Sequence, residues 1–351
     1  MSDPLPCLGV VVVTFNASDV ILDCLESLLA ARDVDLRVVV VDNASSDDTV
    51  ATLRAWASGQ QPYTAPDDIP FPLPAAPKPV SLDGSEMITL VEAGVNGGFA
   101  AGVNIGLSHL AAMEGVDHFW VLNPDSVAAS HTPAAYAACA AAHPGYGLMG
   151  GRTCYLDPPE RIQMDGGTVN RWTGVTGNLN LGATDAQTPC PTADQFDFIT
   201  GANVIASRRF YEEIGPMPED YFLYYEEVDW AARGAHLPRV FCDATRVYHR
   251  TGTAIGSPTL DRIASPFSMY FKYRGRMRFV ARTNPVALPV TWAYAMAKAA
   301  QITLKGARAE ARALVAGACG LKPPRAVADR LSPEAAAIAF GRSQNRPNVE
   351  R

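Results

Sequence analysis

Two runs of β-branched residues near the start of the chain limit its fold more than any other feature of the sequence. Residues 8–14 (LGVVVVT) and 36–42 (LRVVVVD) are almost continuously apolar, and polar turn residues follow each run. Strands with this pattern are buried on both faces, as in a parallel sheet between two layers of helices. Helical patterns follow the runs at about 18–31 and 47–57. The sequence therefore predicts an α/β fold with a mainly parallel central sheet.

The alternation of strands and helices is interrupted once and ends before the last quarter of the chain. Seven prolines lie between Pro62 and Pro79, so we expect residues 59–85 to form an irregular insertion. From residue 264 onward the helical pattern dominates. We therefore expect an α/β catalytic domain over residues 1–263, carrying the 59–85 insertion, and a basic helical C-terminal region over 264–351.

Charge is divided unevenly along the chain. The net charge of −7 argues against a dedicated nucleic-acid-binding protein, and we expect no nucleic-acid partner. Residues 251–351, however, contain 16 basic and 5 acidic residues. A basic amphipathic helix at 265–282 would suit an anionic membrane surface or a lipid diphosphate. The alternative interpretation is a packed helix whose basic side chains extend past apolar surface to water.

The cysteines and the apolar stretches indicate the cellular compartment in which the protein works. The chain opens without a basic n-region, and the apolar stretch 285–304 contains two prolines and Lys298, so neither predicts a signal peptide or a membrane span. The seven cysteines are scattered, odd in number and without a C-x-x-C pair, which predicts neither a disulfide framework nor a zinc ribbon. We expect a cytoplasmic protein, with peripheral contact at the inner face of the cytoplasmic membrane through residues 264–351.

Polar side chains follow the first two predicted strands. At the carboxyl ends of parallel strands, Asp42 could accept a hydrogen bond from a nucleobase N–H, and Asn16 and Asn43 could contact a ribose. The alternative interpretation is turn and capping chemistry, which uses the same residue types. The glycine-rich segment 96–106 (NGGFAAGVNIG) allows close backbone approach to a ligand. It is neither a Walker motif nor a dinucleotide fingerprint after the first strand, which disfavours a P-loop NTPase and an NAD-dependent oxidoreductase.

Two later segments contain candidate chemistry. Asp125 ends an apolar strand in the turn LNPDS, where a carboxylate can hold Mg²⁺ or Mn²⁺ against a diphosphate, and His249 ends another strand as a candidate metal ligand. Asn-Pro-Asp-Ser is also an ordinary turn. Glu226, Glu227 and Asp229 lie in the aromatic run YFLYYEEVDW, where burial would raise a carboxyl pKa and suit a general base. A solvated first helical turn is the competing interpretation.

In their order and spacing over roughly residues 8–280, these motifs resemble the inverting glycosyltransferases of family 2. The most similar group is that of the bacterial rhamnosyltransferase-like enzymes. The segments that carry the resemblance are VVVTFN, VVVVDNAS, NGGFAAGVNIG, LNPDS, DFITGANVIASRRFYEEIG, YFLYYEEVDW and VYHR. The resemblance implies the GT-A nucleotide-sugar transferase fold, here with a helical C-terminal extension.

The resemblance also implies roles for individual residues. Asp125 takes the last position of the family's Asp-x-Asp metal motif, where Asn123 replaces the first aspartate, and His249 completes the coordination of Mg²⁺ or Mn²⁺. Glu227 takes the position of the catalytic base, with Glu226 as the alternative. The implied donor site contains Thr14, Asn16, Asp42, Asn43, Asn96, Gly98, Phe99, Asn104 and Asn123. Gly201 and Ala202 lie near the acceptor, and Asp229 and Trp230 orient it.

The resulting hypothesis is an inverting hexosyltransferase of bacterial surface polysaccharide synthesis. It would move a sugar, L-rhamnose from dTDP-rhamnose by preference, from a dTDP- or UDP-linked donor to a hydroxyl of a glycan or lipid-linked glycan. The alternatives are transfer of a glucosyl, galactofuranosyl or N-acetylglucosaminyl group, and a non-catalytic relative that binds nucleotide-sugar or glycan. A nucleotidyltransferase is disfavoured, because VTFNASDV contains neither the glycine nor the basic residue of its loop.

Overall fold

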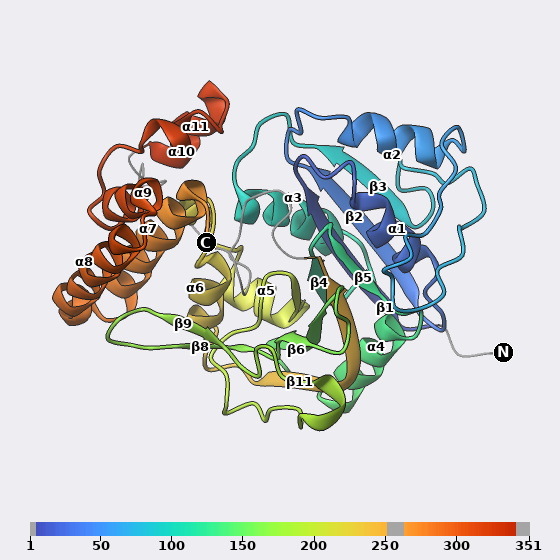
Figure 1. Cartoon of the computed structure of the whole chain (residues 1–351). Coiled ribbons are helices and arrows are strands. Elements are labelled where there is room, and N and C mark those ends of the chain that lie inside the picture. The colour runs from blue at the N-terminus through green and yellow to red at the C-terminus, as the bar shows by residue number, and fades with distance from the viewer. Residues whose placement is uncertain (1–4, 251–262, 342–351) are drawn as a thin grey trace.

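The computed structural model describes residues 5–250 and 263–341 of the chain. Within them a nine-stranded mixed sheet forms the centre of the molecule, with helices on both faces (Figure 1). The order along the sheet is β3 (Ile88–Glu92), β2 (Asp35–Asp42), β1 (Cys7–Thr14), β4 (His118–Leu122), β10 (Asn203–Ser207), β6 (Leu148–Tyr155), β11 (Arg239–His249) and β5 (Ser126–Ala128), and β7 (Ile162–Met164) pairs with β6.

The first four strands are parallel to one another, and the rest of the sheet is mixed. β2 pairs with β1 and β3, and β1 pairs with β4, all in parallel. β10 is antiparallel to β4 and β6, whereas β6 and β11 are parallel. The parallel arrangement predicted for residues 8–14 and 36–42 is confirmed. The strands at 126–128 and 203–207 were not predicted, because they are short and lie in segments rich in turn residues.

Alternate valines of the two runs point to opposite faces of the sheet. Val11 and Val39 pack with helix α3 (Phe99–Ala111), while Val10 and Val38 pack with helices α1 (Ile21–Leu29) and α2 (Thr49–Ala57). Burial of both faces explains why these strands are continuously apolar. Helix α3 lies unusually close to β1, since a Cβ added at Gly106 would lie 2.4 Å from the Val11 side chain.

The remaining elements complete the α/β part of the molecule. A small second sheet pairs β8 (Gly167–Val169) with β9 (Thr176–Asn178). The other helices up to residue 250 are α4 (Thr132–Ala142), η1 (Asp185–Gln187), α5 (Arg208–Ile214), η2 (Glu219–Tyr221) and α6 (Glu226–Arg233). Residues 58–87 contain no helix or strand, as expected for the proline-rich insertion. Glu26 is fully buried in α1 and binds this insertion through the amide of Ala76 and the ammonium of Lys78.

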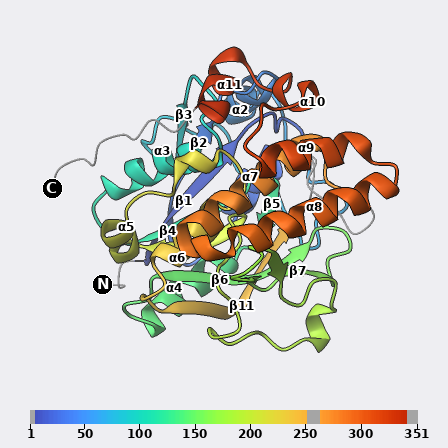
Figure 2. The same ribbon diagram turned by 90° about the vertical axis from the view of Figure 1, so that its left-hand side faces the viewer.

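Helices alone follow residue 263 in the described chain. They are α7 (Pro266–Thr283), η3 (Pro285–Ala287), α8 (Leu288–Leu304), α9 (Arg308–Ala318), α10 (Arg325–Ala328) and α11 (Pro333–Phe340). Figure 2 shows α7, α8 and α9 in front of the sheet, on the side of α6. Among the described residues, no helix is both long and apolar enough to cross a membrane. The domain boundary at 263 stays a prediction.

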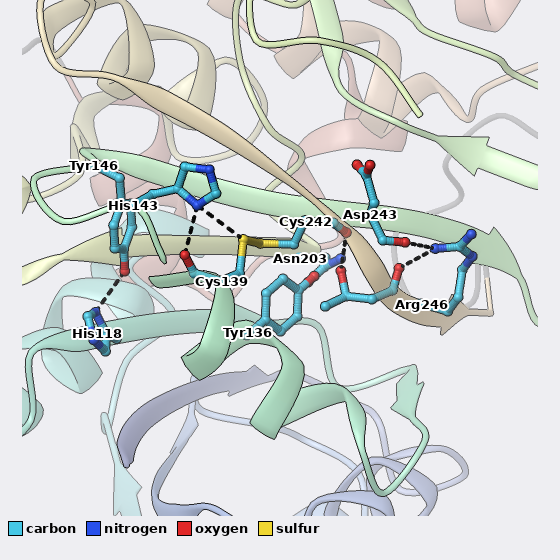
Figure 3. Close-up of a disulfide and its surroundings, with 10 residues drawn as sticks. His118, Tyr136, Cys139, His143, Tyr146, Asn203, Cys242, Asp243 and Arg246 are labelled. Carbon is cyan, nitrogen blue, oxygen red and sulfur yellow. Dashed lines mark hydrogen bonds between the residues drawn. A yellow bond between two sulfur atoms is a disulfide. The ribbon is translucent and has the colours of Figure 1, made fainter. Parts of the chain in front are cut away.

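A disulfide between Cys139 and Cys242 corrects the expectation drawn from the cysteine pattern. It joins α4 to β11, two elements that pack side by side although the cysteines are 103 residues apart (Figure 3). Spacing along the sequence could not reveal this pair, because only the folded sheet brings the two elements together. The other five cysteines are free.

Candidate active site

The carboxyl ends of the parallel strands lie at one edge of the sheet. Thr14 at the end of β1 is in register with Asp42 at the end of β2, and Asp42 is in register with Glu92 at the end of β3. Asn123 follows β4, the strand on the other side of β1. The polar residues predicted at these strand ends are therefore neighbours in space, at the position where α/β sheets bind their ligands.

Two oxygen atoms at this edge are buried without a hydrogen-bond partner. They are Oγ1 of Thr14 and Oδ1 of Asp42, whose residues are 0% and 3% exposed. The other carboxylate oxygen of Asp42 accepts a hydrogen bond from the amide of Ser45 at 3.0 Å. A buried polar atom without a partner costs about 1–3 kcal/mol. Two such atoms side by side suit a ligand that supplies polar groups, such as a nucleobase.

Asn16 and Asn43, which lie beside Thr14 and Asp42, form hydrogen bonds with neighbouring loops. The side-chain Oδ1 of Asn16 accepts a hydrogen bond from the backbone amide of Ser46, and the backbone amide of Asn16 donates to Ser45 Oγ. The side chain of Asn43 donates to the carbonyl of Gly98 at 2.9 Å and to Asn96 Oδ1 at 3.2 Å. These bonds tie together the loops after β1, β2 and β3, so both residues shape the site rather than offer unsatisfied groups to it.

The glycine-rich loop joins the strand ends to the segment before α6. Gly98 has φ = +91°, and a Cβ at this position would lie 2.3 Å from the carbonyl oxygen of Phe222. The next amide, of Phe99, donates to that same carbonyl at 2.9 Å. Only glycine fits this close approach of two backbones. The loop therefore positions residues 222–227 directly against the strand-end site.

Asn123, Asp125 and His249 meet where β4 and β11 end. His249 Nε2 lies 3.0 Å from Asp125 Oδ1 and 3.2 Å from Asn123 Nδ2. Its other ring nitrogen, Nδ1, lies 2.8 Å from Oε1 of Gln163. Gln163 is 9% exposed and carried no signal in the sequence. When Nδ1–H donates to this carbonyl oxygen, the Nε2 lone pair is left to accept from the Asn123 amide or to bind a cation shared with Asp125, an arrangement typical of metal-ligating histidines.

The predicted metal pair is thus assembled, although it is small. Across the described part of the chain, no group of three or more His, Cys, Asp or Glu side chains could hold a metal ion. One carboxylate and one imidazole leave most of a coordination sphere to other oxygens. Such a pair fits Mg²⁺ or Mn²⁺ bound together with the diphosphate of a substrate, because Mg²⁺ commonly takes one or two protein carboxylates plus phosphate oxygens and water.

The turn that precedes α6 has an unusual backbone. Phe222, Tyr224 and Tyr225 have φ values of 66°, 67° and 76°, in the left-handed region that non-glycine residues rarely adopt. Each such residue costs about 1–3 kcal/mol and persists only when its surroundings hold it in place. Here the amide of Phe99 binds the Phe222 carbonyl, and the hydroxyl of Tyr225 donates to the carbonyl of Gly174 at 2.5 Å. The turn places Glu226 and Glu227 at the start of α6.

Both glutamates have raised pKa values. Burial raises the pKa of Glu226 well above 4.5, and the nearby charge of Glu227 raises it further. Oε2 of Glu226 is buried and without a hydrogen-bond partner. Burial also raises the pKa of Glu227, against the opposing effects of helix amides and of Lys272. Raised carboxyl pKa values argue against a solvated helix terminus and would suit a general base.

Gly201 and Ala202 connect the glutamates to the strand-end site. A Cβ added at Gly201 would lie 3.1 Å from the ring of Phe99 and 3.9 Å from Cβ of Glu227. The carbonyl of Ala202 accepts a hydrogen bond from the amide of Asn123 at 3.2 Å. These two small residues therefore lie between the base candidates and the Asp125–His249 pair.

Asp229 and Trp230 face the protein interior. Asp229 accepts hydrogen bonds from the Tyr221 hydroxyl and from Arg282 of α7, each at 2.7 Å. Trp230 is 1% exposed, donates to the carbonyl of Gly215 and packs edge-on against Phe210. Both residues stabilise the position of α6, so we leave them out of the proposed catalytic and acceptor-binding groups.

Asn104 and the basic helix α7 are also engaged within the fold. The amide group of Asn104 bonds to both backbone groups of Met217, which connects α3 to the segment before α6. In α7, Arg282 pairs with Asp220 and Asp229, and Arg278 pairs with Asp220. For these two arginines the interpretation as a packed helix fits better than that of a membrane-facing one.

Known proteins share the fold and part of the sequence. The sequence model of Glycosyl transferase family 2 matches residues 9–69, which include Thr14, Asn16, Asp42 and Asn43. The structure of GalNAc-T7 with UDP, GalNAc and Mn²⁺ has a TM-score of 0.56 and 12% identity, over 89% of this chain and 55% of that one. This chain thus spans only about half of that protein's length. No curated protein sequence matches significantly.

Two further structures are similar at lower TM-scores. Mannosyltransferase PcManGT from Pyrobaculum calidifontis, in complex with GDP-Man and Mn²⁺, has a TM-score of 0.49 and 18% identity over 93% of this chain and 79% of that one. TarS 1–349 of S. aureus has a TM-score of 0.45 and 14% identity over 81% and 69%. The strand order, the family 2 match over residues 9–69 and the similarity to GalNAc-T7 give the chain the α/β GT-A fold.

Proposed function

We propose that the protein is an inverting glycosyltransferase that moves a sugar from a nucleoside diphosphate to an acceptor hydroxyl. The observation that carries the proposal is the position of Glu227, a carboxylate with a raised pKa that lies beside Phe99 and Gly201, next to the strand-end site. The family 2 match over residues 9–69 supports it, because that segment contains the proposed base-binding residues Thr14 and Asp42.

In this proposal, separate groups of residues bind the nucleobase, contact the diphosphate and remove the proton of the acceptor hydroxyl. The unpartnered oxygens of Thr14 and Asp42 bind the nucleobase, and the loop at Asn96–Phe99 contacts the diphosphate. Glu227 removes the proton from the acceptor hydroxyl as that oxygen attacks the sugar C1. The nucleoside diphosphate leaves from the opposite face, so the anomeric centre is inverted. Glu226 lies one residue earlier and is the alternative base.

Asp125 and His249 would hold Mg²⁺ or Mn²⁺, with Gln163 orienting the imidazole. The ion would neutralise charge on the leaving diphosphate. Full binding of the donor nucleotide after exhaustive chelation, with no change on adding Mn²⁺, would contradict this assignment.

The donor, the acceptor and the location extend the proposal. L-rhamnose from dTDP-rhamnose is our preferred donor, on the resemblance of the Asn123-Pro-Asp125 turn to the rhamnosyltransferase-like group. Glucosyl, galactofuranosyl and N-acetylglucosaminyl donors, dTDP- or UDP-linked, are the alternatives. The acceptor would be a glycan or lipid-linked glycan of the bacterial envelope, reached from the cytoplasm, with residues 264–351 at the membrane surface. Mass-spectrometric screening of donors against the purified protein tests these assignments.

The decisive variant is Glu227→Gln. We expect kcat to fall by about 10²–10⁴-fold, the usual contribution of general base catalysis, while the Kd of the donor nucleotide changes little. Glu226→Gln is the matched variant, one position away on the same helical turn. If Glu226→Gln has the larger effect on kcat, the base is Glu226. If neither variant reduces turnover, the base is another group, with Asp229 as the next candidate. If the wild type neither transfers nor hydrolyses any donor, a non-catalytic binding protein becomes the better interpretation.

A further inference from the structure

Helices α7 and α8 bring three basic side chains together beside the catalytic carboxylate. Lys272 and Arg276 lie one turn apart on α7, and Lys298 lies one turn after Tyr294 on α8. The guanidinium of Arg276 lies over the Tyr294 ring, 5.4 Å from its centroid. Because the two helices run antiparallel through a short connection, contact between residues 276 and 294 places residue 272 opposite residue 298. The two lysines therefore face each other across the helix pair.

These three cations differ from the other basic residues of α7. Arg278 and Arg282 pair with Asp220, and Arg274 donates to the carbonyl of Ala339. In contrast, within the described residues no carboxylate lies within ion-pair distance of Lys272, Arg276 or Lys298. Lys298 donates to the side-chain oxygen of Gln301, and Arg276 donates to the Tyr225 hydroxyl.

Arg276 is buried, and Lys272 and Lys298 are half-buried, so the lack of carboxylate partners is costly. Arg276 is 3% exposed, and its NH1 nitrogen is buried without a hydrogen-bond partner. Burial, together with the charges of Arg276 and Lys298, lowers the pKa of Lys272 to about 8, against the opposing effect of Glu227. Charged groups that are taken out of water are normally paired. A cluster that keeps its positive charge beside a substrate site therefore fits an anionic ligand.

The cluster lies on the acceptor side of the proposed base. The face of α7 that carries Lys272 packs directly on the strained turn before α6, because a Cβ added at Gly275 would lie 2.7 Å from the carbonyl oxygen of Tyr224. Tyr224 also donates to Ser268, one turn before Lys272. The charges of Lys272 and Glu227 interact across this contact. The proposed diphosphate site, in contrast, is formed by the loop at 96–99 and the Asp125–His249 pair.

We propose that Lys272 and Lys298 bind an anionic group of the acceptor, held close to the hydroxyl that Glu227 deprotonates. The guanidinium of Arg276 lies over the rings of Tyr273 and Tyr294, so it adds positive potential to the subsite without touching the ligand. The acceptor then carries a phosphate, as in a lipid-linked or phosphodiester glycan, or a sugar carboxylate. This inference rests on the proposed function, since it assigns the acceptor class of the same site.

Lysine labelling tests the subsite without requiring turnover. The full-length protein is acylated with limiting acetic anhydride at equal ionic strength in chloride, inorganic phosphate or acetate, and each lysine is quantified by peptide mass spectrometry. Phosphate at about four times its Kd should slow the labelling of Lys272 and Lys298 by about fivefold, by mass action. Lys305, exposed just after α8, serves as the internal control and should label at the same rate in all three salts.

The salts separate the two sources of the anion. Protection by phosphate alone indicates a phosphate-bearing acceptor, and protection by acetate as well indicates a sugar carboxylate. In Lys298→Met the protection of Lys272 should fall at least to half, whereas Lys305→Met should leave it unchanged. Equal labelling rates in all three salts, or no labelling of Lys272 in any of them, would overturn the inference. Binding of UDP and dTDP, measured by calorimetry on the same samples, tests the proposed donor site separately.

Discussion

The donor side and the acceptor side of the candidate site differ in how their polar groups are arranged. At the ends of β1 and β2, Thr14 and Asp42 keep buried oxygens without partners. Around α6 and α7, Asp229 and Arg282 satisfy each other across the two helices, although Glu226 Oε2 and Arg276 NH1 also lack partners there. The position of a strand end is fixed by sheet register, so its polar groups can stay without protein partners and remain available to a ligand. A helix placed beyond the sheet needs its own polar contacts to hold it in position.

The largest expected effect comes from breaking the contact between the two sides. In Gly98→Ala, the new Cβ would clash with the Phe222 carbonyl, 2.3 Å away, in addition to the strain at φ = +91°. We expect the free energy of unfolding to fall by about 2–4 kcal/mol, measured by urea denaturation, together with a loss of kcat as Glu227 is displaced.

Gly94→Ala is the matched control for this clash. Gly94 also has a positive φ, of 74°, but an added Cβ would meet nothing within 4 Å. Its cost should be only the backbone strain, about 1 kcal/mol, with kcat preserved. Equal losses in the two variants would show that the contact with Phe222 does not hold the two sides together.

The second prediction concerns the ion pair that fixes α6 on α7. Asp229→Asn removes the charge that faces Arg282 inside the protein, where the Asp229 side chain is 5% exposed. Because Arg282 is partly exposed and can regain water, we expect a loss of about 2 kcal/mol rather than the cost of a fully buried pair. Asp220→Asn, which loses the solvent-facing partner of the same arginine, should cost less than about 1 kcal/mol. Thermal unfolding compares the two, and a kcat loss for Asp229→Asn as large as that for Glu227→Gln would restore a catalytic role for Asp229.

The same division explains what the sequence could predict. The runs at 8–14 and 36–42 determine the parallel strands, and strand ends in register bring Thr14 and Asp42 together without further information. The disulfide partner of Cys139 and the orientation of Asp229 depend instead on how α4, α6 and α7 pack on distant parts of the chain. The family resemblance proposes Glu227 as the base, but the sequence pattern alone does not separate Glu227 from Asp229, since both belong to one acidic helical turn.

The third prediction uses pH to examine the acceptor side. Burial raises the pKa of Glu226 well above 4.5, so its folded-state pKa exceeds its unfolded-state pKa. Its contribution to stability is therefore fully present below about 4.5 and is lost as pH rises through the raised pKa. At pH 8 the free energy of unfolding of Glu226→Gln should exceed that of wild type by about 1–3 kcal/mol, the cost of an unsatisfied buried group. Thermal unfolding should show this as a higher midpoint temperature, and the difference should shrink at pH 4.5.

Glu114→Gln provides the control for this pH dependence. Glu114 is exposed in the loop after α3, so its substitution should leave the difference from wild type near zero at both pH values. A Glu226→Gln variant that is less stable than wild type at pH 8 would mean that the carboxylate is well solvated. In that event, the reason for preferring a buried base at this turn would be lost.

The smallest effect separates a ligand site from ordinary turn chemistry on the donor side. Thr14→Val keeps the shape of the side chain and removes an oxygen that has no partner. Stability should therefore stay unchanged or rise by up to about 1 kcal/mol, while the Kd of UDP or dTDP should increase by about fivefold for one lost hydrogen bond.

Thr49→Val is the matched control. It removes a hydroxyl that accepts from Ala17 and donates to Asp47, so stability should fall by about 1–2 kcal/mol with no change in Kd. Calorimetry and denaturation together distinguish the two threonines, because only Thr14→Val should weaken nucleotide binding and only Thr49→Val should lower stability. If both variants behave like Thr49→Val, then the end of β1 is a structural turn, and the nucleotide must bind elsewhere along the sheet.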